Sequence, residues 1–254
     1  MSSDVRVEDG VMDEEQKAVV IETAAATYYY HKEGGGFSSL IDRDGRDWIS
    51  YRPGDGPAGE YRGIPNMVFR GEKGGFFHPG HAGEKGSETR LLESGPERAS
   101  LLSTSVNGRW QVRWDIYPEC ARMTVLRTDP EDSNYWFLYE GTPGGAFELE
   151  RSRCGRCTGE IGSLEERWEA DLPSPSWVYF TDPERNRSLF LYSEKRDRCA
   201  DMYKPMEPMT VFGFGRRIEG VDSSIAGEGN VFYIGLVEAA EHEMVAAAVE
   251  RITG

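Results

Sequence analysis

The chain has 254 residues, with 44 acidic residues against 29 lysines and arginines and a formal net charge of -15 at pH 7. No run of Lys and Arg offsets this negative field, so nucleic acids and membranes are not expected partners. The first twenty residues contain neither a basic nor an apolar segment, and no later run reaches the ~18 apolar residues of a membrane span, which predicts a cytoplasmic protein.

Residues 1–16 are polar and acidic and have little to bury, so we expect a loose tail there. Residues 17–254 are then a single domain, because β-sandwiches of roughly 200–250 residues commonly fold as one unit. Short runs of β-branched and aromatic residues alternate with clusters of Gly, Pro, Asn and Asp, which is typical of many short strands. The chain is therefore predicted to be all-β.

The clearest predicted strand covers residues 109–117, in which Trp110, Val112, Trp114 and Ile116 alternate with polar residues. This period of two indicates one buried face and one solvated face. The other expected strands are residues 19–31, 37–41, 48–51, 123–126, 135–139, 177–180, 189–192, 209–214 and 231–237.

The C-terminal end alone has a helical pattern of apolar residues. The expected apolar face of this helix consists of Met244, Val245, Ala248, Val249 and Ile252. Two polar stretches, residues 52–88 and 141–172, interrupt the strands. Long loops in compact domains are usually functional or disordered, so we look for the site there.

The first stretch gathers Arg62, His78 and His81 with Glu60, Tyr61 and Asn66. Arg62 could neutralise an anionic or developing charge while a histidine transfers a proton near neutral pH. The alternative is that these side chains hydrogen-bond the backbone of the loop.

Metal ligation is a further alternative for this stretch, because two histidines lie three residues apart close to Glu60. Pro79 between them excludes the helical HExxH type of zinc site. The cysteines offer one metal-like spacing, Cys154 and Cys157, without a second pair. We therefore expect no cofactor and no metal site.

The second stretch follows an aromatic run that ends in Glu140. In a strand, Trp136 and Leu138 would face one way and the neighbouring rings the other, so that one set could form a platform for a sugar beside Glu140. If both faces are covered, the rings are core residues instead. Further along this stretch, Trp168 directly follows Arg167, so that a basic and an aromatic group lie together there as well.

Further along the chain, Tyr203 and Lys204 combine a potential base with a positive charge. Because adjacent residues of a strand point to opposite faces, at most one of the two can join a shared site.

The order of several segments resembles the aldose 1-epimerase, or galactose mutarotase-like, supersandwich. The segments are residues 34–45 (GGGFSSLIDRDG), 61–66 (YRGIPN), 77–83 (FHPGHAG), the strand at Trp110 and residues 135–139 (YWFLY). The resemblance covers roughly residues 34–140. It implies an antiparallel β-supersandwich, here with one C-terminal helix, and a carbohydrate site on one sheet.

In a typical mutarotase a histidine on a later strand serves as the acid, whereas the one histidine after His81 in this chain is His242, on the predicted helix. A carbohydrate ligand and a lyase acting by β-elimination on a uronate-containing glycan are therefore expected. Arg62 would bind the uronate carboxylate, and His78, His81 or Tyr203 would remove the proton α to it. Glu60, Tyr61, Asn66, Glu140, Trp168 and Lys204 are the expected substrate-binding residues.

Three alternatives to the lyase remain open. They are a non-catalytic carbohydrate-binding sandwich, a sugar epimerase, and a glycoside hydrolase with paired carboxylates such as Glu140 and Glu60.

Overall fold

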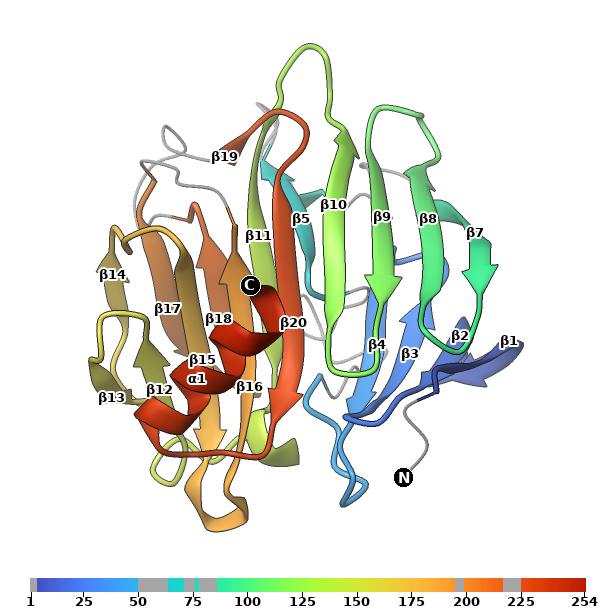
Figure 1. Ribbon diagram of the computed structural model, residues 1–254. Coiled ribbons are helices and arrows are strands. Elements are labelled where there is room, and N and C mark those ends of the chain that lie inside the picture. The colour runs from blue at the N-terminus through green and yellow to red at the C-terminus, as the bar shows by residue number, and fades with distance from the viewer. Residues whose placement is uncertain (1–3, 50–63, 71–75, 78–85, 195–198, 217–224) are drawn as a thin grey trace.

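The computed structural model of the chain describes residues 4–49, 64–70, 76–77, 86–194, 199–216 and 225–254. Two large sheets face each other as a sandwich, and a smaller sheet of four strands lies at one end (Figure 1). The assigned strand pairs are antiparallel. The predicted all-β antiparallel class is confirmed.

The larger sheet has nine strands. In spatial order they are β13 (Ile161–Ser163), β12 (Arg153–Arg156), β15 (Ser176–Asp182), β16 (Arg187–Ser193), β20 (Val231–Val237), β10 (Ala121–Arg127), β9 (Gln111–Ile116), β8 (Ala99–Ser105) and β7 (Ser87–Ser94). The buried face predicted for β9 is present, because Val112, Trp114 and Ile116 are fully buried, but Asp115 on the expected solvated face is also buried, at 1% exposure.

The second large sheet has seven strands. Its order is β14 (Trp168–Ala170), β17 (Asp201–Met206), β18 (Met209–Phe214), β11 (Asn134–Gly141), β5 (Asn66–Arg70) and β6 (Phe76–Phe77), with β19 (Ile225–Ala226) pairing to β11. The four-stranded sheet consists of β1 (Arg6–Asp13), β2 (Gln16–Glu22), β3 (Thr27–His31) and β4 (Gly36–Ile41). Two 3-10 turns complete the loops, η1 (Pro143–Gly145) and η2 (Pro183–Arg185).

Aromatic side chains fill the space between the two large sheets. Phe137 of β11 stacks on Phe232 of β20 with ring centroids 4.3 Å apart. Phe180 of β15 contacts Tyr203 of β17 at 5.8 Å and Phe212 of β18 at 6.3 Å. Rings of this size bury large apolar areas, so these contacts stabilise the sandwich and fix which face of each strand is internal.

The helix α1 (His242–Thr253) lies across the outer face of the nine-stranded sheet (Figure 1). Val245 and Val249 are buried against a second apolar cluster that includes Tyr179, Phe190 and Tyr233. Met244, placed on the apolar face in the sequence analysis, is instead 64% exposed. No helix among the described residues combines the length and the apolar character needed to cross a membrane.

Several segments differ from the sequence predictions. Residues 6–13 form β1 and pair with β2, although a loose tail was expected over residues 1–16. The single strand expected at residues 19–31 is a hairpin of β2 and β3. The polar stretch at 141–172 contains β12, β13 and β14, and no strand covers the buried residues Trp48 and Ile49.

A buried arginine ties the sheets to the turn after β4. Arg187, which is 4% exposed, lies 2.7 Å from Asp42 Oδ2, 2.9 Å from Asp44 Oδ2 and 3.0 Å from Glu238 Oε1. Burial opposes ionisation of Asp42, but hydrogen bonds from Trp48, the Arg46 backbone and Arg187 outweigh it and lower the pKa of Asp42. Arg187 therefore serves the architecture and not the site described below.

Candidate functional site

Strand β11 divides its side chains between two environments. Three of its rings point into the core: Tyr135, Phe137 and Tyr139. Trp136, Leu138 and Glu140 alternate with these rings and therefore lie on the outer face of the seven-stranded sheet. The division expected from the sequence is correct. Trp136 and Leu138 are only 7% and 4% exposed, so they form a covered apolar base and not an open platform for a sugar.

Glu140 and Lys204 lie on one row of this outer face. Glu140 is opposite Val211 of β18, and Val211 is opposite Lys204 of β17. Directly opposed residues of antiparallel strands project from the same face. Neighbouring strands are ~4.8 Å apart, so the Cα atoms of Glu140 and Lys204 are separated by about 10 Å.

The segment after β18 sends Arg216 back across the same face. Gly215 turns the chain with a φ of +70°, and its N–H donates to Asp201 Oδ1 at 3.0 Å. A Cβ at Gly213 would lie 2.9 Å from Arg216 Cβ and 3.1 Å from Arg216 Cδ. The Arg216 guanidinium carbon is 5.9 Å from the centroid of the Trp136 ring. The absence of a side chain at Gly213 thus leaves the space that Arg216 fills.

We call Glu140, Lys204 and Arg216 the charged cluster. Burial raises the pKa of Glu140 to about 7, against the opposing effect of the positive charges on Arg216 and Lys204. Burial, together with the positive charge of Arg216, lowers the pKa of Lys204. Burial also lowers the pKa of Arg216, against the attraction of Glu140. The three groups therefore influence one another electrostatically.

The charged cluster is not closed by ion pairs within the described part of the chain. No ion pair there joins Glu140, Lys204 or Arg216 to an opposite charge. Arg216 Nη1 is buried and has no hydrogen-bond partner among those residues. Half-buried charges held apart in this way cost stability, and such arrangements are typical of functional sites.

The chemistry available to the charged cluster follows from its three groups. A carboxyl group with a pKa near neutrality can accept or donate a proton at physiological pH. Two neighbouring cations can bind an anionic group and stabilise negative charge that develops on it. The cluster can therefore bind an acidic ligand and transfer a proton to or from it.

Two of the predicted site residues lie on the inner face of this sheet. Tyr203 is fully buried, and its hydroxyl donates to the Leu164 carbonyl oxygen at 2.6 Å. Trp168 is opposite Tyr203, and its ring lies 5.8 Å from that of Phe212. The predicted roles of Tyr203 as a base and Trp168 as a binding residue are therefore corrected: both are packing residues, because strand alternation turns them away from Lys204.

Asn66 is on the same face as Leu138, its partner across the strands. Its side chain is fully buried, donates to the Gly34 carbonyl oxygen at 2.6 Å and accepts from the Met67 N–H at 2.8 Å. Asn66 thus holds the backbone and has no exposed group for a ligand. The other predicted site residues lie outside the described residues: Glu60, Tyr61, Arg62, His78 and His81.

Of the predicted site residues, the structure brings together Glu140 and Lys204. Arg216 was missed, although the sequence Gly213-Phe-Gly215 directly before it carried a signal: two glycines around one buried ring allow a side chain to fold back over the strand. The described residues contain no group of three or more His, Cys, Asp or Glu able to hold a metal ion.

The two facing antiparallel sheets give this protein the galactose mutarotase-like β-supersandwich fold. The protein HI1317 is similar, with a TM-score of 0.58 and 10% identity over 92% of this chain and 99% of that one. A galactose mutarotase-like protein from Clostridium acetobutylicum has a TM-score of 0.56 and 7% identity over 92% and 98%.

A galactose mutarotase related enzyme from Lactobacillus acidophilus has a TM-score of 0.50 and 11% identity, covering 87% of this chain and 98% of that one. No protein-family model and no curated protein matches the sequence. At identities this low, the similarity establishes the fold and leaves the activity to be argued from the site.

Proposed function

We propose that this protein is a carbohydrate-active enzyme that binds a sugar bearing a carboxylate on the outer face of its seven-stranded sheet. The observation that carries the proposal is the charged cluster, in which a carboxyl group with a pKa of about 7 stands beside two cations without an ion pair to either. The names of the fold neighbours from C. acetobutylicum and L. acidophilus, both referring to galactose mutarotase, support a sugar ligand.

The reaction best suited to this cluster begins with removal of the proton α to the sugar carboxylate. Arg216 and Lys204 pair with the carboxylate and stabilise the enolate-like charge, which is the difficult part of the step. Glu140, ionised above pH 7, accepts the proton. When the electron pair then expels the oxygen on the next carbon, a double bond forms and the glycosidic C–O bond breaks, which is β-elimination by a lyase.

In this proposal Glu140 takes the role of base for which the sequence analysis offered His78, His81 or Tyr203. Arg62, His78 and His81 stay predictions, since they lie outside the described residues. The departing oxygen also needs a proton donor, and we now propose His78 or His81 for that role in place of the predicted role of base.

A second candidate is the interconversion of sugar anomers, which the names of the fold neighbours favour. Glu140 could accept the proton of the anomeric hydroxyl group in that reaction. A neutral aldose, however, leaves Lys204 and Arg216 without a partner. The elimination uses all three groups of the charged cluster and is therefore our main proposal.

The test compares Glu140→Gln with the wild type on oligosaccharides of galacturonate and glucuronate. Unsaturated product is followed by its near-ultraviolet absorbance, and anomer interconversion by proton NMR. We expect Glu140→Gln to lower kcat for elimination by at least ~100-fold, the usual contribution of a general base. Glu169→Gln is the matched control, because Glu169 is an exposed carboxylate on the same outer face, opposite Met202.

Wild-type elimination that survives Glu140→Gln would remove Glu140 from the mechanism. Anomer interconversion without unsaturated product would favour the second candidate. Binding of uronates with neither product would leave a carbohydrate-binding sandwich and contradict the proposed enzyme activity.

A further inference from the structure

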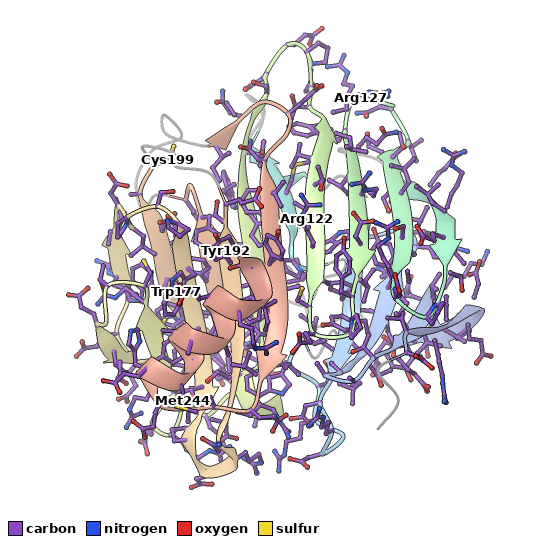
Figure 2. All side chains as sticks on the ribbon, viewed as in Figure 1. Arg122, Arg127, Trp177, Tyr192, Cys199 and Met244 are labelled. Carbon is purple, nitrogen blue, oxygen red and sulfur yellow. The ribbon has the colours of Figure 1, made fainter. Side chains whose placement is uncertain are left out.

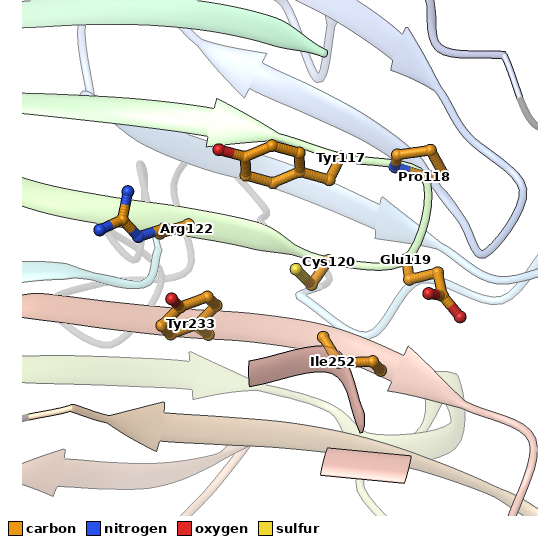
Figure 3. A pocket seen from close by; sticks show the side chains of 7 residues that line it. All are labelled: Tyr117, Pro118, Glu119, Cys120, Arg122, Tyr233 and Ile252. Atoms are coloured by element: carbon orange, nitrogen blue, oxygen red, sulfur yellow. The ribbon is translucent and has the colours of Figure 1, made fainter. Parts of the chain in front are cut away.

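A pocket of about 430 Å³ lies on the other side of the molecule from the charged cluster, on the outer face of the nine-stranded sheet. It is lined by Tyr117, Pro118, Glu119, Cys120, Arg122, Tyr233 and Ile252 (Figure 3). These residues come from the turn between β9 and β10, from β10 and β20, and from the last turn of α1. Its volume is within the ~300–1,000 Å³ range of small-molecule sites.

Arg122 and Tyr233 are directly opposed on β10 and β20 and form one wall of the pocket. The Arg122 guanidinium carbon lies 5.9 Å from the centroid of the Tyr233 ring. Arg122 Nε is buried and has no hydrogen-bond partner within the described part of the chain. No ion pair there joins Arg122 to a carboxylate, even though the protein has an excess of acidic residues.

Two carboxylates lie near this pocket. Glu119 pairs with Arg251 of α1, with 2.7 Å between Glu119 Oε1 and Arg251 Nη1. Glu194 accepts a hydrogen bond from the Tyr233 hydroxyl at 3.2 Å, and its negative charge helps to raise the pKa of Arg122. Arg122 thus interacts with Tyr233 and, at longer range, with Glu194, but among the described residues no carboxylate forms an ion pair with it within 4.0 Å.

The rest of the lining is apolar or aromatic. The rings of Tyr117 and Tyr233 and the side chains of Pro118 and Ile252 surround Cys120 in Figure 3. Burial raises the pKa of the Cys120 thiol to about 12, so this group is neutral and adds no negative charge at physiological pH. Aromatic and aliphatic walls with one orienting charge are characteristic of sites for small molecules with an apolar body.

We propose that this pocket is a second ligand site, which binds a small anion, carboxylate or phosphate, carried on an apolar ring. The anionic group pairs with Arg122, and the ring packs between Tyr117, Tyr233 and Ile252. The site is independent of the charged cluster, because the two lie on outer faces of different sheets. It therefore does not depend on the proposed enzyme activity.

The experiment titrates the full chain with benzoate and with phenyl phosphate by calorimetry, using benzyl alcohol as the neutral ring and acetate and inorganic phosphate as anions without a ring. We expect the ring-bearing anions to bind at least ~10-fold more tightly than either partial probe, because each of those loses the ion pair or the apolar contact. Benzoate and phenyl phosphate separate a carboxylate ligand from a phosphate ligand.

The variant Arg122→Gln is expected to weaken binding of the preferred probe by at least ~10-fold, since it removes the charge that orients the ligand. Arg127→Gln is the matched control: Arg127 is an exposed arginine at the far end of the same strand, and it donates to the Gly108 carbonyl oxygen at 2.9 Å (Figure 2). A thermal melt of both variants verifies that they are folded.

Location is tested by proton NMR of the complex with the preferred probe. Nuclear Overhauser contacts are expected between the ring protons of the ligand and the rings of Tyr117 and Tyr233, because both rings line the pocket. Absence of binding at millimolar concentrations, equal affinity of Arg122→Gln and the wild type, or no contact of the bound ligand with either ring would each overturn the proposal.

Discussion

At the scale of single residues, the charged cluster differs from the structural charges of this protein in its lack of ion pairs within the described residues. Arg187 shows how this protein treats a structural charge: it is buried and paired with three carboxylates. Glu140 and Arg216 instead share a face of the sheet without an ion pair in the described residues, and burial raises the pKa of Glu140 to about 7 against the attraction of the two cations. Because unpaired buried charge lowers stability, this contrast supports a functional role for the cluster.

The raised pKa of Glu140 makes two pH dependences run in opposite directions. Folding raises this pKa from 4.5 to about 7, so the native state binds more protons than the unfolded state between these values. The contribution of Glu140 to the free energy of unfolding therefore decreases as the pH rises from ~4.5 to ~7. Activity that needs the ionised base increases over the upper part of the same window.

Denaturant unfolding of the wild type and Glu140→Gln at pH 5 and pH 8 tests this assignment. Glutamine resembles the protonated carboxyl group, so we expect the variant to be more stable relative to the wild type at pH 8 than at pH 5. A stability difference that does not change with pH would show that the pKa of Glu140 is not raised.

Sequence reasoning found two of the three members of the charged cluster, Glu140 and Lys204, for a physical reason. Glu140 ends an aromatic run, and alternation alone placed it on the face of β11 opposite to Tyr135, Phe137 and Tyr139. Alternation also showed that Tyr203 and Lys204 could not share a site, but not which of them faces the core. That choice is made by Phe180 of the facing sheet, which packs on Tyr203 at 5.8 Å and has no sequence signal linking it to β17.

At the scale of elements, strand alternation predicted most of the strands, and the wrong predictions have two different causes. The hairpin of β2 and β3 was read as one strand because its turn, residues 23–26, consists of Thr and Ala and lacks Gly, Pro, Asn or Asp. Strand β1 was missed because it is mostly exposed, and its burial pattern contains no apolar alternation to detect.

Strand β18 provides the element-scale prediction. In Gly213→Val, the new side chain would occupy the space of Arg216, whose Cβ lies 2.9 Å from the position of the added Cβ. We expect the fold to persist, since valine favours strands, but Arg216 to be displaced and affinity for a uronate to fall by at least ~10-fold. The measurement is calorimetry with galacturonate oligosaccharides.

Gly162→Val is the control for that variant, because a Cβ at Gly162 of β13 would meet no atom within 4 Å. We expect it to retain wild-type affinity. If Gly213→Val binds the uronate as tightly as Gly162→Val does, Arg216 does not contribute to the site.

At the scale of the whole molecule, the core residues and the candidate sites lie on different faces of the two sheets. The space between the sheets is filled with rings such as Phe137 and Phe232, whereas the two candidate sites lie on the outer faces. The resemblance detected in residues 34–140 was sufficient for the fold, and the structural neighbours bear it out. Arg216 was not predicted because it lies outside that region and reaches the outer face only by folding back after β18, whereas strand pairing brings Lys204 to the side of Glu140.

The central claim is that the charged cluster recognises the carboxylate of a sugar acid. Calorimetric titration of the wild type with a uronate oligosaccharide and with the matching neutral oligosaccharide tests it most directly. We predict that the uronate binds at least ~10-fold more tightly and that Lys204→Met combined with Arg216→Gln abolishes the difference. Equal affinities for the two sugars, or a preference for the uronate that persists in the double variant, would contradict the account.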